Sequence, residues 1–105
     1  MAVDLQKVRR ETMRWNILLT LNHAKPIGCF EELILATVQG MFPDATAKEA
    51  RLELDYLADR KLVNVKKQPD GRWFADLSRY GIDLVEYTCD CHPGIARPEK
   101  YWSHS

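Results

Sequence analysis

Apolar residues recur every three or four positions between residues 4 and 22, and this spacing predicts a helix with a broad buried face. The apolar positions are Leu5, Val8, Met13, Trp15, Ile17, Leu18, Leu19 and Leu21. The charged positions, which we expect largely on the opposite side, are Lys7, Arg9, Arg10, Glu11 and Arg14. Pro26 and Gly28 predict the end of this helix, because a proline disfavours helical geometry in the residue before it and a glycine permits a turn.

A second helix is predicted over residues 30–41. Glu31 and Glu32 fall in its first turn, where carboxylates suit the positive end of the helix dipole. Its buried face is expected to carry Leu33, Ile34, Val38 and Met41. A turn over residues 42–45 separates it from the next element.

A third helix is predicted from Thr46 to about Lys61, because Thr46 and Glu49 have the spacing of a capping box. Its core positions are expected to be Ala47, Ala50, Leu54, Leu57 and Ala58. Residues 62–66 alternate as a strand, 67–71 form a turn that ends in Asp-Gly, and 72–77 form the returning strand. Two strands alone are marginally stable, so the hairpin must pack on the helices and the fold class is α+β.

A fourth helix is predicted after Ser78, which can cap it, and it reaches residue 87. We therefore expect one domain over residues 1–88, with an extended first helix, and a C-terminal tail over 89–105. The tail is too rich in proline for a helix but carries Tyr101 and Trp102. Aromatic side chains in a tail lie against other groups, so we expect it to pack on the domain or on a partner.

Charge and composition exclude several classes of protein. Fifteen Lys plus Arg balance fifteen Asp plus Glu, which excludes a strongly basic nucleic-acid coat but not a local basic face. No apolar run is long enough to cross a membrane, and the charged N-terminus does not resemble a signal peptide. The three cysteines are an odd number, which suits a reducing compartment. We expect a soluble cytoplasmic protein that does not act at a membrane.

Motifs for catalysis and metal binding are weak. The sequence contains no glycine-rich phosphate loop, no HExxH motif and no Gly-x-Ser-x-Gly elbow, so we expect neither an enzyme nor a cofactor. Cys89, Cys91 and His92 are possible zinc ligands, and Cys29 or His104 could complete a set. A structural zinc site normally presents two pairs of ligands, whereas only one is visible here, so we expect no metal.

Residues 10–87 resemble a winged helix-turn-helix domain. The similarity rests on the capped helix TAKEARLELDYLADRKLV (residues 46–63), on the basic strand and Asp-Gly hairpin that follow it, and on FADLSRYGIDLVE (residues 74–86). The resemblance implies a three-helix core, a two-stranded wing hairpin, a C-terminal helix and an extended aromatic tail. The short chain with its PGIARPEKYW tail also resembles small proteins of unassigned role encoded by Mu-like phages and prophages.

In DNA-binding winged helices the third helix enters the major groove and the wing contacts the backbone or the minor groove. Carried onto this sequence, the resemblance implies DNA contacts by Thr46, Lys48, Arg51 and Tyr56 of the third helix and by Lys66, Lys67 and Arg72 of the wing. Asp55 shares the exposed face of that helix. Four positive and four negative side chains between residues 46 and 61 leave this helix neutral, whereas Lys61, Lys66, Lys67 and Arg72 outnumber Asp70 in the wing.

The leading hypothesis from the sequence is a protein that binds double-stranded DNA, as a small transcriptional regulator of a phage or another mobile element. The alternative is a protein–protein interaction module that keeps the winged-helix scaffold without binding DNA and meets a phage or host protein. A homodimer is compatible with either hypothesis.

Overall fold

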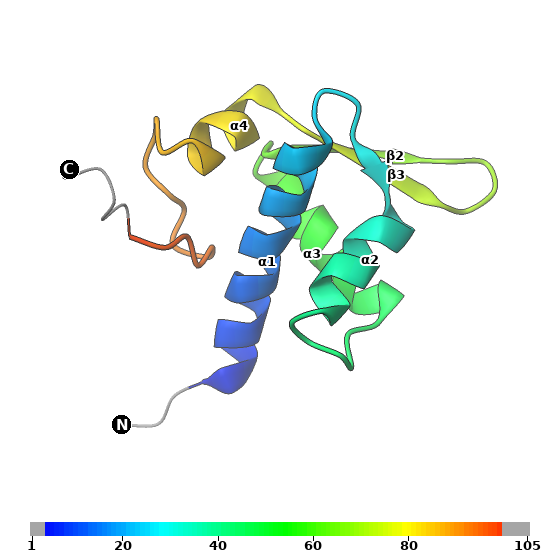
Figure 1. Ribbon diagram of the computed structural model, residues 1–105, viewed down its shortest axis with the longest axis horizontal. Coiled ribbons are helices and arrows are strands. Elements are labelled where there is room, and N and C mark those ends of the chain that lie inside the picture. The colour runs from blue at the N-terminus through cyan, green and yellow to red at the C-terminus, as the bar shows by residue number, and fades with distance from the viewer. Residues whose placement is uncertain (1–3, 100–105) are drawn as a thin grey trace.

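The longest element among the described residues, helix α1 (Leu5–Ala24), crosses the molecule and packs against the three other helices found there (Figure 1). The computed structural model describes residues 4–99. Asp4 caps α1 by accepting a hydrogen bond from the backbone N of Lys7 at 3.1 Å. The helix runs two residues beyond the predicted end, and the chain turns at Lys25 and Pro26.

Two shorter helices lie beside α1. Helix α2 (Glu31–Gln39) begins one residue after its predicted start, and helix α3 (Ala47–Asp59) begins after Thr46 as predicted. The Thr46 hydroxyl accepts a hydrogen bond from the backbone N of Glu49 at 3.2 Å, so the predicted N-cap is confirmed. Helix α3 ends at Asp59, and Lys61 adopts a φ of 63° where the chain leaves the helix.

A three-stranded antiparallel sheet has the order β1-β3-β2. The hairpin strands β2 (Val63–Lys67) and β3 (Trp73–Leu77) agree with the prediction within one residue. Strand β1 (Cys29–Phe30) was not predicted, because two residues carry no readable alternation. Its approach to β3 requires Gly28, which has a φ of 96° and no room for a Cβ beside the carbonyl group of Ala75.

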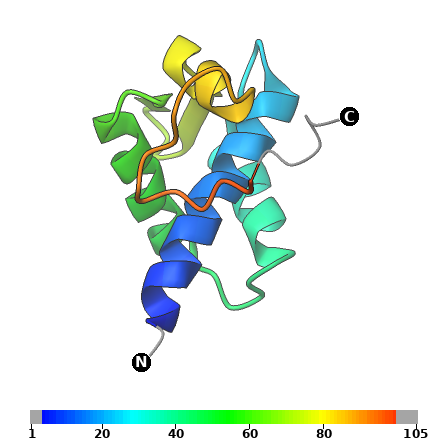
Figure 2. The same cartoon turned by 90° about the vertical axis from the view of Figure 1, so that its left-hand side faces the viewer.

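Helix α4 (Arg79–Val85) is capped by the Ser78 hydroxyl, which accepts from the backbone N of Gly81 at 3.1 Å. The chain then crosses the face of α1 as an extended tail (Figure 2). Ile95 is buried against the core, and the backbone N of Ala96 donates to the carbonyl of Glu11 at 3.1 Å. This part of the tail packs on the domain, whereas Tyr101 and Trp102 lie outside the described residues.

The core lies where α1 meets the other helices and the sheet. Its largest fully buried side chains are Met13, Ile17, Leu18, Leu21, Ile34, Leu54, Leu57, Leu62, Leu84 and Val38. Within residues 4–99, no helix is both long enough and apolar enough to cross a membrane.

Several predicted core positions were wrong. Leu5, Val8, Leu33 and Met41 are exposed large apolar residues, and Ala47 is exposed as well. The helical period correctly predicted that apolar residues share one side of α1. The first turns of α1, however, extend past the elements that bury the rest of the helix (Figure 1). On α2, Ile34 and Val38 are buried as predicted, whereas Leu33 is exposed and the Glu31 carboxylate is buried on the inward side instead.

The charged side of α1 was also placed wrongly, because part of it faces α3 and not solvent. Arg9 contacts the Glu49 carboxylate at 2.7 Å, and Arg14 contacts the Glu53 carboxylate at 2.7 Å. Glu53 is buried. Ion pairs therefore join α1 to α3 beside the apolar core.

Candidate nucleic-acid interface

One buried carboxylate holds the β2–β3 hairpin against the helices. Glu31, the first residue of α2, is 8% exposed and accepts two hydrogen bonds of 2.6 Å from Nε and Nη2 of Arg51. It also accepts from the backbone N of Trp73 at 2.7 Å, while Arg51 Nη2 donates to the Gly71 carbonyl at 2.8 Å. The hydrogen bonds from Arg51 hold the pKa of Glu31 below its ordinary value. We call these four residues the hairpin latch.

A second ion pair lies at the rim of the hairpin. Arg72 Nε donates to Glu32 of α2 at 2.8 Å, and its guanidinium carbon lies 3.9 Å from the centre of the Phe30 ring. The backbone N of Arg72 donates to Asp70 at 3.0 Å within the turn. Arg72 is exposed, but its side chain is directed back toward α2.

The lysines of β2 are the more available cations of the hairpin. Lys66 pairs with Phe74 in the strand register and Lys67 with Trp73, so the two lysines leave opposite faces of the strand. The Lys67 ammonium lies 4.6 Å from the centre of the Trp73 ring. Both lysines are exposed, and neither forms an ion pair within the part of the chain that the structure describes. Their positive charges therefore remain available to an anion.

The outer face of α3 is of mixed character. Lys48 and Asp55 are both exposed, and Leu52 between them is 58% exposed. Together with Ala47 and Arg51 they line a groove of about 250 Å³. Thr46 is exposed, but its hydroxyl is engaged in capping the helix. Lys48 therefore provides a positive charge on this face that is not neutralised by any carboxylate among residues 4–99.

Tyr56 lies on the side of α3 that faces the tail. Its ring is held between the guanidinium groups of Arg14 at 3.4 Å and Arg60 at 3.5 Å. It also packs so closely against Gly94 that a Cβ there would overlap its hydroxyl. Arg14 fixes this part of the tail by donating to the Gly94 carbonyl at 2.9 Å. The structure thus brings Lys48, Arg51 and the hairpin together but turns Tyr56 toward the tail.

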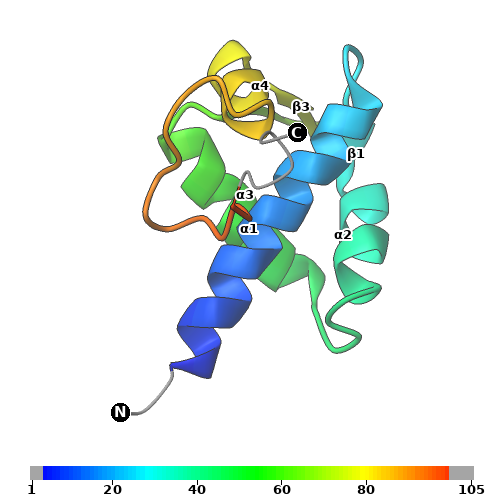
Figure 3. The same ribbon diagram turned by 60° about the vertical axis from the view of Figure 1, so that its left-hand side comes forward.

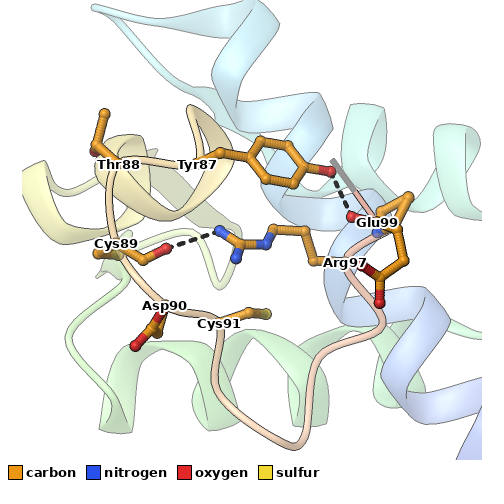
Figure 4. Close-up of a pocket in the computed structure, with 8 residues that line it drawn as sticks. Tyr87, Thr88, Cys89, Asp90, Cys91, Arg97 and Glu99 are labelled. Carbon is orange, nitrogen blue, oxygen red and sulfur yellow. Dashed lines mark hydrogen bonds between the residues drawn. The ribbon is translucent and has the colours of Figure 1, made fainter. Parts of the chain in front are cut away.

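The tail encloses a polar pocket of about 410 Å³ (Figure 4). Its lining residues are Tyr87, Thr88, Cys89, Asp90, Cys91, Arg97, Pro98 and Glu99. Arg97 spans the loop, because its Nη1 donates to the carbonyls of Leu84 and Cys89 at 2.9 Å each. The Tyr87 hydroxyl donates to the Pro98 carbonyl at 2.8 Å. These contacts hold the tail in a closed loop.

The structure does not assemble the metal ligands considered from the sequence. Among residues 4–99, no three His, Cys, Asp or Glu side chains are grouped as metal ligands. Cys29 is buried in β1, His104 lies outside the described residues, and burial raises the pKa of both Cys29 and Cys91. A raised pKa favours the thiol, whereas a metal binds the thiolate.

The sequence did not reveal the part played by Glu31 and Glu32. Both were assigned only to the first turn of a helix, where they suit the dipole. Their arginine partners are 20 and 40 residues away along the chain, so no local spacing identifies them. The net charge counted for the hairpin from the sequence omitted Glu32, which lies against Arg72.

Comparison with known proteins finds no family model that matches this sequence and no significant match among curated proteins.

Proposed function

We propose that this chain is a winged-helix domain that binds double-stranded DNA, with the β2–β3 hairpin as the wing and α3 beside it as the recognition helix. The support for this fold assignment is the element order, the packing of α2 on α3, and the antiparallel sheet that ends in an exposed hairpin. The resemblance to winged helices and to small phage proteins extends the proposal to a transcriptional regulator of a phage or mobile element.

The observation that carries the proposal is the pair of unneutralised lysines on a fixed hairpin. Phosphate neutralisation by lysine and arginine supplies most of the nonspecific affinity for DNA. Lys66 and Lys67 are exposed without ion pairs in the described chain, and the latch between Glu31 and Arg51 fixes the hairpin that carries them. A fixed cationic hairpin loses little conformational entropy when it binds the backbone.

The recognition helix contributes less in this proposal. Lys48 lies near the N-terminus of α3, where the helix dipole also attracts a phosphate. Arg51 is held by Glu31, so it can contact a base only by giving up two short hydrogen bonds, and Asp55 repels the duplex. Binding is therefore expected to depend strongly on salt and weakly on base sequence.

The test is a fluorescence-anisotropy titration of a labelled duplex at several salt concentrations between about 50 and 200 mM. Three phosphate contacts, by Lys48, Lys66 and Lys67, predict that log K falls with log salt with a slope of about −3. Replacing Lys66 and Lys67 together by Ala is expected to reduce the slope by about two. Lys7→Ala is the control, because Lys7 is an exposed α1 lysine without an ion pair among the described residues.

Absence of binding at the lowest salt, or an unchanged slope in the double variant, would contradict the proposed role of the wing. The second candidate is then a protein-interaction module on the same scaffold, which the exposed Leu52 between two opposite charges favours. Leu52→Lys separates the two candidates. It is expected to strengthen DNA binding if α3 faces a duplex and to weaken partner binding if α3 faces a protein.

A further inference from the structure

Helices α1 and α2 lie side by side (Figure 3), and a row of uncharged residues follows one side of each helix. On α1 the residues that share this side, spaced every three or four positions, are the exposed Leu5 and Val8 and the half-buried Thr12, Asn16 and Leu19. On α2 they are Leu33 and Thr37, and Met41 follows in the turn after this helix. Leu5 is 73% exposed and Leu33 is 54% exposed. In a chain with 29% charged residues, an exposed apolar surface across two helices is characteristic of a protein contact. We call it the α1–α2 face.

The α1–α2 face contains a groove of about 460 Å³. Leu19 of α1 and Leu33 of α2 form its apolar walls, and Asn16, Thr20 and Thr37 supply neutral polar groups. His23 and Ala24 complete the lining, so no Asp, Glu, Lys or Arg is present. No tail residue lines the groove among residues 86–99.

We propose that the occupant of this groove is the first turn of α1 from a second copy of the same chain. The face carries both parts of the contact, because Leu5 and Val8 protrude from α1 and the groove lies farther along the same helix. In a two-fold dimer the same patch meets itself, so a charged patch would repel itself whereas this one does not. The proposal rests on the α1–α2 face and is independent of DNA binding.

The spacing along α1 defines the register of the proposed dimer. Two antiparallel α1 helices whose two-fold axis passes Thr12 place Leu5 opposite Leu19 of the second copy, and Val8 opposite Asn16. Leu5 and Leu19 each lie seven residues from Thr12, or about 10 Å along the helix axis. The protruding turn of each copy thereby reaches the groove of the other, and the two contacts are equivalent.

The size of the face limits how stable the dimer can be. Helix α1 has 20 residues and is about 30 Å long, whereas α2 has 9 residues and is about 14 Å long, and each helix is about 10 Å wide. The face therefore covers about 440 Å² per copy, or about 880 Å² in the pair, which is in the range of weak interfaces below about 1,200 Å². We expect a concentration-dependent dimer and not an obligate one.

The test is the molar mass of the full chain by sedimentation equilibrium from micromolar to submillimolar concentration. The wild-type mass should rise from 12.2 kDa toward twice that value. Leu5→Lys and Leu33→Glu should each keep the chain monomeric, since each introduces a charge at an apolar contact. The double variant should restore the dimer, because each new lysine then meets a new glutamate of the other copy. Both leucines are exposed, so circular dichroism should show an unchanged fold.

Leu52→Lys is the matched control, because Leu52 is similarly exposed but lies on α3, and it should leave the dimer intact. A wild-type chain that stays monomeric overturns the proposal, as does dissociation by Leu52→Lys. Single variants that still dimerise, or a double variant that does not, overturn the register. A chain that dimerises only after removal of residues 100–105 also overturns it, because the groove is then covered by its own C-terminus.

Discussion

Arg51→Ala distinguishes a side chain that holds the hairpin from one that reads DNA. In the structure Arg51 donates two hydrogen bonds to Glu31 and one to the Gly71 carbonyl, and its guanidinium carbon lies 4.8 Å from the centre of the Trp73 ring. Removing it leaves the Glu31 carboxylate with one remaining donor, the backbone N of Trp73. We therefore expect the substitution to lower the free energy of unfolding.

The expected loss follows from the burial of the two partners. A hydrogen bond to a charged group contributes about 1.5–3 kcal/mol, and a carboxylate left buried without its partner adds a desolvation penalty. The Glu31 side chain is buried, but that of Arg51 is 37% exposed, so solvent screens part of the interaction. A total loss of about 2 kcal/mol is expected. The coupling free energy between Arg51→Ala and Glu31→Gln should be about 1 kcal/mol.

Urea unfolding followed by circular dichroism measures this loss. At neutral pH, Arg51→Ala should lower the free energy of unfolding by about 2 kcal/mol, whereas Lys48→Ala on the same helix should change it by less than about 0.5 kcal/mol. The pH dependence has a definite sign, because Arg51 lowers the pKa of Glu31 below its ordinary value of 4.5. The stabilisation is complete above that value and is lost as the pH falls through the lowered pKa. The difference in free energy of unfolding between wild type and Arg51→Ala should therefore become smaller at acidic pH.

A variant that unfolds like wild type but binds DNA more weakly would refute the structural role of Arg51. The same result would restore Arg51 as a DNA-reading residue. Loss of stability with a small change in DNA affinity would support the latch instead.

Three further predictions test the fold by urea unfolding. Gly28→Ala should lower the free energy of unfolding more than Gly71→Ala does, because both glycines have positive φ but only Gly28 lies against a strand carbonyl. Equal losses would show that strand β3 shifts to accommodate the added Cβ without loss of stability. Thr46→Ala should cost about 1 kcal/mol through loss of the α3 N-cap, and no loss would contradict the capping bond. Arg14→Ala should cost about 3 kcal/mol, because it leaves the carboxylate of Glu53 buried without its cation; a loss below about 1 kcal/mol would show that water replaces the arginine.

Much of the local structure could be predicted from the sequence. The Thr46 cap, the helical spacing of α1 and the Asp-Gly turn each involve residues within a few positions of one another. Signals of this kind depend on backbone geometry and short-range hydrogen bonds, which the neighbouring residues determine. They specified four helices and the hairpin, with boundaries that differ by one or two residues.

The sequence alone could not determine which side chains of the candidate site remain available. It identified Arg51 and Lys66 both as candidate DNA contacts, but only the fold brings Glu31 to Arg51 across 20 residues and to Trp73 across 42. It also assigned Leu5 to the core, because helical period gives the direction of a side chain but not how far the packing elements extend. Charges and apolar groups were determined by the sequence, whereas their pairing and exposure were decided by tertiary contacts between residues distant in the chain.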